Sequence, residues 1–305
     1  MTQHTPDWIA VDWGTSSLRV WLMRGDGEVL ERRRSESGMG GLSRDGFEPA
    51  LLELVGDVLR DGRALPVICC GMVGSRQGWA EAPYASVPCA PPGIAQATLV
   101  RSAEPRIAAY ILPGIKQAAP ADVMRGEETQ IAGILAADPG FDGILCLPGT
   151  HTKWAHISAG EIVSFRTFMT GEMFALLGEQ SVLRHSVADA GWDAAAFDAA
   201  VAEAMSRPER VAAALFSLRA ETLLSGLAAQ TARARLSGLL IGMELAAARP
   251  YWLGQPVRIV GADAIAAPYL AALRAQAAEV SCVADEEITL RGLIGAYAAL
   301  SEGVE

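Results

Sequence analysis

The chain has 305 residues, of which 51% are hydrophobic and 20% charged, and 35 acidic against 25 basic residues give a formal net charge of −10. This composition is typical of a globular protein, and the acidic balance argues against a nucleic-acid partner, because binding a polyanion requires a basic surface. Apolar runs stay short of the roughly 18 residues that span a bilayer, and residues 1–7 contain neither a basic patch nor an apolar stretch, so we expect a cytoplasmic protein without a membrane segment or export signal.

The first part of the chain predicts an α/β pattern, because apolar runs bounded by turn residues indicate strands and a 3.6-residue period indicates helices. In chain order, the predicted elements are strands at 8–12, 18–24 and 28–34, a helix at 47–60, and strands at 67–70 and 107–112. Gly25-Asp26-Gly27 is a tight turn, which makes the first three strands an antiparallel meander. Residues 80–105 are rich in proline and lack periodicity, which favours an ordered surface excursion.

The rest of the chain repeats this pattern with more helix. The predicted elements are a helix from 122, a strand at 144–147, paired strands at 154–157 and 162–165, a mainly helical region at 170–249, a strand at 257–260, a helix at 264–273, a strand at 279–283 and a helix at 287–300. The length favours two lobes, which we place at residues 1–120 and 121–305. The alanine-rich helices at 194–249 either pack within the second lobe or form a homodimer face.

Two strand tips carry a glycine followed by threonine, an arrangement that suits a phosphate. The first tip contains Asp12, Gly14, Thr15 and Ser16, and the second contains Gly149, Thr150 and Lys153. Glycine allows close approach of backbone N–H groups, the hydroxyls add donors, Lys153 adds positive charge, and Asp12 would hold Mg²⁺. The alternative is that both are ordinary hairpin turns with Asp12 capping the backbone. No Gly-x-x-x-x-Gly-Lys-Ser/Thr sequence is present, so a P-loop is excluded.

A pair of acids follows between the two tips, in Met124-Arg125-Gly126-Glu127-Glu128. Phosphorylation of an alcohol requires a carboxylate that orients the hydroxyl and takes its proton, and Glu127 or Glu128 is the candidate base, with Glu127 preferred. The alternative is a solvated pair of acids that favours the positive end of a helix.

A small polar substrate would be bound by residues of two further segments. These candidates are Ser75, Arg76, Gln77, Trp79, Arg166 and Glu172. They supply planar cations for a carboxylate, polar groups for hydroxyls and an aromatic wall, and Arg76 is the expected carboxylate clamp. Arginine and tryptophan in loops equally often form surface ion pairs and lids over a core.

Small residues near the C-terminus could accommodate an adenine ring. Gly238 lies in an apolar helical run, and Gly261 and Ala262 follow the predicted strand at 257–260. Packing between helices explains Gly238 equally well, and a strand-to-helix cap at Asp263 explains the second group.

Together, these motifs resemble those of the 2-dehydro-3-deoxygalactonokinases. The resemblance rests on Asp12-Trp13-Gly14-Thr15-Ser16, on residues 71–79, on Met124-Arg125-Gly126-Glu127-Glu128 and on residues 147–154, and it extends over nearly the whole chain. It implies the actin-like ATPase fold of sugar kinases and hexokinases, with two ribonuclease-H-like lobes and a cleft between them. It also implies ATP-dependent phosphorylation of 2-dehydro-3-deoxy-D-galactonate at its 6-hydroxyl in galactonate catabolism, with ATP and Mg²⁺ required.

On that template Asp12, Gly14 and Thr15 match the first phosphate motif and Gly149, Thr150 and Lys153 the second, while Gly261 falls in the adenosine motif. One departure concerns the metal, since the superfamily usually has an acid where this chain has Pro148. Three alternatives remain open: a kinase for the related 2-dehydro-3-deoxygluconate, a non-catalytic actin-like sugar sensor, and an ATPase of the same superfamily that acts without a sugar.

Overall fold

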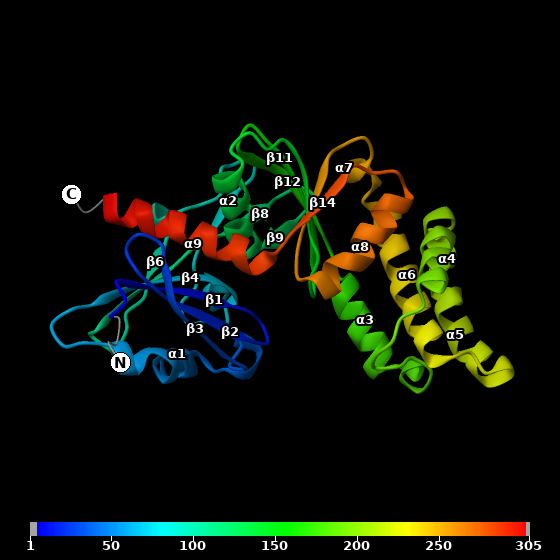
Figure 1. Cartoon of the computed structure of the whole chain (residues 1–305), viewed down its shortest axis with the longest axis horizontal. Helices are drawn as coiled ribbons and strands as arrows, with labels where there is room; N and C mark the ends of the chain where they lie inside the picture. Colours follow the sequence, from blue (N-terminus) through cyan, green and yellow to red (C-terminus); the bar gives the residue numbers. More distant parts are fainter. Residues whose placement is uncertain (1–4, 303–305) are drawn as a thin grey trace. The chain divides into compact units, whose positions relative to one another are not determined.

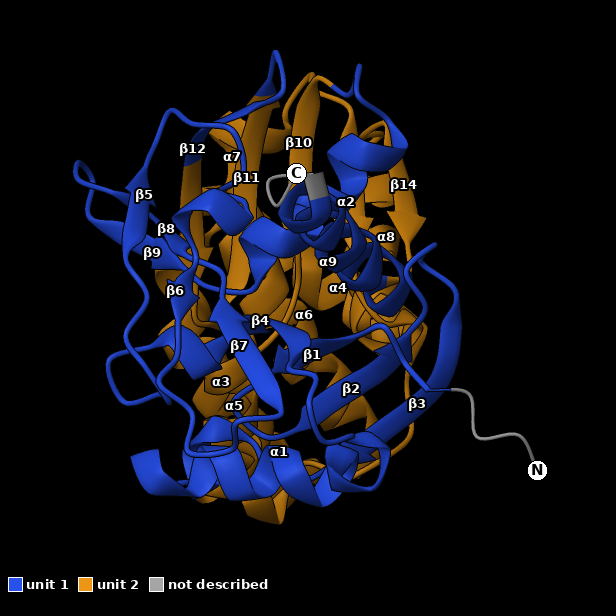
Figure 2. Cartoon of the chain, turned by 90° about the vertical axis from the view of Figure 1, so that its left-hand side faces the viewer, with its two compact units in different colours: residues 1–141, 158–164, 285–305 blue, residues 142–157, 165–284 orange. Residues whose placement is uncertain are grey.

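The computed structural model describes residues 5–302 and divides the chain into two compact units (Figure 2). Unit 1 comprises residues 1–141, 158–164 and 285–305, and unit 2 comprises residues 142–157 and 165–284. Residues 1–4, part of the stretch in which no export signal is expected, lie outside the described residues.

Unit 1 is built on a six-stranded sheet with the order β3-β2-β1-β4-β7-β6. Its strands are β1 (Trp8–Trp13), β2 (Leu18–Met23), β3 (Val29–Ser35), β4 (Leu65–Gly71), β6 (Thr98–Leu99) and β7 (Ile107–Ile111). The predicted antiparallel meander of β1, β2 and β3 is confirmed, and β4 runs parallel to both β1 and β7. Since parallel strands end at one edge of a sheet, Asp12 of β1 and its register partner Cys70 of β4 lie side by side there.

The sheet of unit 2 has the order β12-β11-β10-β13-β14, which repeats the arrangement from β3 to β7. Its strands are β10 (Gly143–Leu147), β11 (Thr152–Ser158), β12 (Glu161–Phe168), β13 (Val257–Val260) and β14 (Val280–Val283). As in unit 1, the first strand pairs antiparallel with the second and parallel with the strand on its other side. The two Gly-Thr turns therefore occupy equivalent places, one after β1 and one after β10.

Helices cover both sheets (Figure 1). Unit 1 contains α1 (Phe47–Val55), α2 (Glu127–Ala137) and α9 (Asp285–Glu302), and unit 2 contains α3 (Thr170–Glu179), α4 (Ala194–Ser206), α5 (Val211–Ser225), α6 (Ala229–Ala247), α7 (Arg249–Trp252) and α8 (Asp263–Ala275). Trp8 stacks on Tyr297 with 4.4 Å between ring centroids, which ties α9 to the first strand of the chain. None of the helices within residues 5–302 is long and apolar enough to cross a bilayer.

Two features of unit 1 differ from the sequence predictions. The helix expected from residue 122 starts only at Glu127, because β9 (Asp122–Met124) pairs antiparallel with β8 (Gly114–Gln117). The excursion at 80–105 contains β5 (Tyr84–Ser86), which pairs in parallel with β8, as well as β6. Strands this short give too few alternations for a periodic signal.

The units also differ from the lobes placed at 1–120 and 121–305, since α2 and α9 both belong to unit 1. These two helices approach closely enough that only glycine fits at the crossing. A Cβ on Gly133 would lie 2.0 Å from the Ile288 oxygen, and one on Gly292 would lie 2.1 Å from the Thr129 oxygen. The crossing holds the C-terminal helix in the N-terminal unit.

Replacement of Gly292 by alanine should therefore destabilise the fold, by about 1–3 kcal/mol, because backbone cannot move aside as a side chain can. Gly295→Ala on the same helix is the matched control, since nothing lies within 4 Å of its added Cβ, and it should leave stability equal or slightly higher. Urea unfolding of the two variants measures the difference. Equal stabilities would contradict this account of the crossing.

Candidate active site

The first candidate group lies at the edge of the unit 1 sheet, where β1 ends in Asp12. The Arg19 guanidinium donates to Asp12 Oδ2 through Nε at 3.0 Å and through Nη2, and its Nη1 donates to Asp285 Oδ2 at 3.2 Å. The Cys70 thiol lies 3.8 Å from Asp12 Oδ1. Burial raises the pKa of Asp12, although the charge of Arg19 opposes this shift. One arginine thus links the acid of the first motif to the start of α9.

The turn after Asp12 leaves Thr15 and Ser16 exposed, as a phosphate grip requires. Its backbone is held from behind: Met39 N–H donates to the Gly14 carbonyl at 3.0 Å and Gly40 N–H to the Thr15 carbonyl at 2.9 Å. A Cβ on Gly38 would lie 2.3 Å from the Ser16 carbonyl carbon, so only glycine permits this contact. No motif in the sequence marks this glycine as part of the site.

The second turn, at 149–151 in unit 2, is braced in the same way. A Cβ on Gly171 would lie 2.2 Å from the Gly149 oxygen, and Glu172 N–H donates to the Thr150 carbonyl at 2.9 Å. Thr150 is exposed, whereas the Lys153 side chain is buried and its Nζ donates to the His151 carbonyl at 3.3 Å. Lys153 thereby contacts the turn from within unit 2.

The two candidate bases at the start of α2 have different environments. Glu128 is 1% exposed, and the Gly126 N–H lies 2.8 and 2.7 Å from its two carboxyl oxygens. Burial, followed by the charge of Glu127, raises the pKa of Glu128 to about 8. Glu127 is only partly buried, and its Oε2 accepts the Arg125 N–H at 3.1 Å. With this pKa Glu128 is mostly protonated at neutral pH, and Glu127 is the better candidate for the base.

The predicted substrate loop in unit 1 is divided between the surface and the core. Arg76 and Gln77 are exposed, and the Arg76 carbonyl accepts from Arg44 Nη2 at 2.8 Å. Ser75 is buried. Trp79 packs edge-on against Trp13 at 6.5 Å and belongs to the core of unit 1, and it also lines a pocket together with Arg44 and Glu48.

The two substrate candidates of unit 2 also differ from each other. Arg166 is exposed on β12. The Glu172 carboxylate lies 2.6 Å from His151 Nε2, and so it flanks the second turn.

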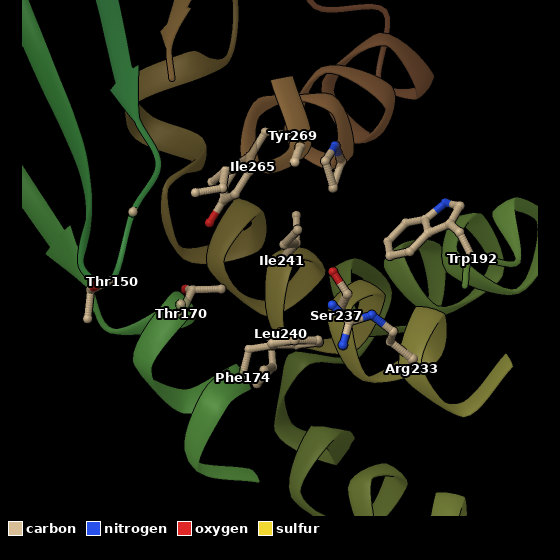
Figure 3. Close-up of a pocket in the computed structure, with 14 residues that line it drawn as sticks. Thr150, Thr170, Phe174, Trp192, Arg233, Ser237, Leu240, Ile241, Ile265 and Tyr269 are labelled. Atoms are coloured by element: carbon tan, nitrogen blue, oxygen red, sulfur yellow. The ribbon is translucent and has the colours of Figure 1, made fainter. Parts of the chain in front are cut away.

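Unit 2 contains a pocket of about 330 Å³ next to the second turn (Figure 3). Thr150 and Trp192 lie on opposite sides of it, and Ser237 and Ile241 of α6 and Tyr269 of α8 form its wall. Arg233 also lines it, with its guanidinium 5.0 Å from the Phe174 ring centroid. Aromatic walls with a few polar groups are typical of small-molecule sites.

The residues predicted to bind adenosine lie beside this pocket but do not line it. Gly238 faces α4, where an added Cβ would lie 2.5 Å from the Phe197 oxygen, so the helix-packing alternative is the correct one for this residue. Gly261 is buried near Pro148, and Ala262 is the exposed N-cap of α8, followed by the pocket residues Ala264 and Ile265. The lining residues of α6 and α8 escaped prediction because nothing in a helical repeat marks which face meets a cavity.

A buried acid, Glu244 of α6, holds the wall of this pocket together. Trp154 Nε1 donates to its Oε1 at 2.7 Å, and the hydroxyls of Tyr269, at 2.8 Å, and Thr170 donate to its Oε2. Burial raises the pKa of Glu244 to about 7. Since these donors come from β11, α8 and α3, a single carboxyl group fixes three elements against α6.

Comparisons with known proteins cover almost the whole chain. A model of the 2-keto-3-deoxy-galactonokinase family matches residues 12–296. The chain belongs to this family. It is therefore a sugar-acid kinase, and the predicted family is confirmed.

Two curated relatives cover almost all of the chain. A protein of Rhizobium meliloti (strain 1021), provisionally named 2-dehydro-3-deoxygalactonokinase DgoK1, is 41% identical over 298 residues, which are 95% of this chain and 96% of the relative. The 2-dehydro-3-deoxygalactonokinase of Escherichia coli (strain K12) is 37% identical over 299 residues, which are 95% of this chain and 97% of the relative.

Solved structures confirm the predicted fold. A Sinorhizobium meliloti protein provisionally named 2-dehydro-3-deoxygalactonokinase superposes with a TM-score of 0.88 at 40% identity, covering 96% of this chain and 99% of the other. The activator of 2-hydroxyisocaproyl-CoA dehydratase from Clostridium difficile shares the fold with a TM-score of 0.52 at 11% identity, covering 97% and 96% of the two chains. The architecture is that of actin-like ATPases and sugar kinases.

The raised pKa of Glu128 predicts that stability falls as the pH rises. The folded chain keeps a proton on Glu128 up to a pKa of about 8, whereas the unfolded chain loses it near 4.5, so the folded state binds the extra proton between these values. The contribution of this group is therefore complete below about pH 4.5 and is lost as the pH approaches about 8. Glu128→Gln should flatten the slope of unfolding free energy against pH, and Glu53→Gln, at an exposed position of α1, is the matched control. Identical slopes for wild type and Glu128→Gln would refute the assignment.

Proposed function

We propose that this protein transfers the terminal phosphoryl group of ATP to the 6-hydroxyl of 2-dehydro-3-deoxy-D-galactonate, giving ADP and 2-dehydro-3-deoxy-6-phosphogalactonate in galactonate catabolism. The observation that carries the proposal is the family match over residues 12–296 together with relatives of that name along nearly their whole length. The side chains and turns described above support the proposal, each for one part of the reaction.

The two Gly-Thr turns are proposed to bind the phosphates. Each has an exposed threonine, Thr15 or Thr150, and a backbone braced by a glycine, so N–H and hydroxyl groups are held ready for anionic oxygens before the nucleotide arrives. Ser16 adds a hydroxyl to the first turn, and Lys153 supports the second.

Asp12 is the proposed ligand for Mg²⁺, which, when bound, neutralises charge on the phosphates. Its Oδ1 is a hard oxygen with only a weak thiol contact, and this suits a cation that needs one or two protein carboxylates, with water and phosphate oxygens completing its shell. Within residues 5–302 no three His, Cys, Asp or Glu side chains gather as a metal cage, so most of the shell would come from the nucleotide and water. Arg19 holds Oδ2 and orients the carboxylate.

Glu127 is the proposed general base. It orients the attacking hydroxyl and accepts its proton as the new P–O bond forms and the bond to ADP breaks. Glu128 would support it as a neutral neighbour whose carboxyl group fixes the Gly126 backbone at the start of α2.

The unit 2 pocket is the proposed adenosine site. It begins at Thr150 of the second turn, so a nucleotide with phosphates at that turn could extend its base towards Trp192 on the far side (Figure 3). The half-exposed indole offers a stacking surface, and Ser237 and Arg233 offer polar contacts.

Glu127→Gln should lower kcat by about 100- to 10,000-fold, the usual contribution of a general base, with little effect on the KM for ATP. Glu128→Gln should keep kcat within about tenfold, because the wild-type group is already neutral at pH 7. Coupled measurement of ADP release decides this, over a panel of 2-dehydro-3-deoxy sugar acids that includes the galactonate and gluconate epimers. A kcat of Glu127→Gln within about tenfold of the wild-type value would refute the assignment of the base.

The same panel separates the competing functions. A preference for the gluconate epimer would favour the related kinase. ADP release without any sugar would favour a simple ATPase, and binding without turnover would favour a sensor.

Gly171→Ala should lower kcat/KM for ATP by about 10- to 100-fold, because a Cβ there displaces the Gly149 carbonyl and with it the second turn. Gly178→Ala lies on the same helix with nothing within 4 Å of its added Cβ, and its kinetics should match wild type. Steady-state kinetics with ATP as the varied substrate measure both. If the two variants behave alike, the second turn does not hold phosphate.

A further inference from the structure

Two neighbouring segments of unit 1 bury polar groups that have no hydrogen-bond partner. Within the described residues, the buried side-chain atoms of this kind are Ser75 Oγ and Arg125 Nε and Nη1. Ser75 is 6% exposed and Arg125 is 9% exposed. Buried polar groups are nearly always paired, so three such atoms on two side chains call for an explanation.

Arg125 is the more unusual of the two, because an unpaired buried charge is strongly unfavourable. Its guanidinium donates once, from Nη2 to the Ala82 carbonyl at 2.8 Å, and its Cζ lies 4.4 Å from the Tyr84 ring centroid. No ion pair of the described residues includes it. Burial raises the pKa of the nearby Glu128 although the Arg125 charge opposes this shift, and no hydrogen bond or ion pair of the described residues joins the two side chains.

Arg125 packs against the segment that leads into Ser75. A Cβ on Gly74 would lie 2.7 Å from Arg125 Nη1, so this arm of the guanidinium lies against the short 3₁₀ turn Met72–Gly74 that leads directly into Ser75. The absence of a side chain at Gly74 gives the guanidinium its place, and the next residue contributes the unpaired hydroxyl.

We infer that Arg125 and Ser75 form a subsite for an organic carboxylate, which we assign to the carboxylate end of the sugar acid. A guanidinium with unused N–H groups and a hydroxyl are the donors that a carboxylate accepts from best. A ligand anion would also supply the missing counter-charge. The assignment rests on the proposed function, because that function defines which carboxylate arrives.

The position of Arg125 fits this role better than the alternatives suggested by sequence. Arg76 and Arg166 are exposed, where an ion pair is screened by water and contributes little. Arg125 is desolvated and already positioned by Ala82 and Tyr84, so little side-chain entropy is lost on binding. It also lies two residues before Glu127, and its own N–H contacts that carboxylate, so carboxylate binding and proton transfer would start from one strand-to-helix junction.

The test compares Arg125→Gln, Arg125→Lys and Ser75→Ala with wild type. Arg125→Gln should raise the KM for the sugar acid by about 10- to 100-fold, the scale of a charged hydrogen bond, and leave the KM for ATP within about twofold. Arg125→Lys should recover only part of this loss, since lysine lacks the planar donors. Ser75→Ala should give a smaller rise in the same KM.

A substrate without the negative charge distinguishes recognition from general damage. The primary amide of the same sugar acid should be a poor substrate for wild type, and Arg125→Gln should discriminate much less between acid and amide. Arg33→Gln is the matched control: it removes an arginine of unit 1 that bonds Glu31 and Asp57, and it should lower stability while leaving the KM for the acid unchanged.

Calorimetric titration with the sugar acid in the absence of ATP keeps this inference separate from the proposed function. Binding to wild type that is lost in Arg125→Gln supports the subsite even if no phosphoryl transfer follows, in which case only the proposed function fails. An unchanged KM and unchanged affinity in Arg125→Gln, or no binding of the acid to wild type, overturns the inference. A rise in KM in Arg76→Gln but not in Arg125→Gln does the same. If Arg125→Gln does not fold, Arg125→Lys and Ser75→Ala decide by the same criteria.

Discussion

Two backbone contacts that only glycine allows determine where the candidate chemistry can take place. Gly38 packs on the carbonyl of Ser16, and Gly171 packs on the carbonyl of Gly149, each at a distance that excludes a Cβ. A turn whose backbone is fixed from behind presents its N–H groups and threonine hydroxyl without reorganisation when an anion binds, and such preorganisation is the main source of electrostatic stabilisation in enzymes. The turns follow equivalent strands of the two sheets, so the same arrangement of a strand, a Gly-Thr turn and a bracing glycine occurs in both units.

Burial gives different properties to three acids of unit 1, Asp12, Glu127 and Glu128. Asp12 is partly buried and its charge is opposed by Arg19, which also bonds to Asp285 at the start of α9. Burial raises the pKa of Glu128 although the charge of Arg125 opposes this shift, whereas Glu127, one residue earlier on the helix, is partly exposed. Desolvation therefore gives different environments to the proposed metal ligand, a structural acid and the proposed base.

Features that depend on short stretches of sequence could be predicted, whereas those that depend on packing between distant residues could not. The β1–β3 meander, β10 to β12 and the two Gly-Thr turns follow from apolar runs and turn residues, so they could be predicted, as could the family from four motifs. The start of α2 could not, because the three-residue strand β9 precedes it. Gly238 was misread because a helical glycine looks the same whether it meets a ligand or another helix. The sequence likewise does not tell whether Arg76 or Arg125 is buried, and only the fold shows that it is Arg125.

The two units share a topology but use buried acids for different purposes. In unit 1 the strand that precedes the turn ends in Asp12, whereas in unit 2 the corresponding strand is followed by Pro148, which has no carboxylate. Unit 2 places its buried acid on a helix instead, where Glu244 accepts hydrogen bonds from three side chains. A carboxylate held in this way stabilises a pocket wall and cannot readily release a donor to bind metal. This difference between two units of like topology fits the proposed roles, in which the first turn has a carboxylate beside it for a metal and the second adjoins a pocket for the rest of the nucleotide.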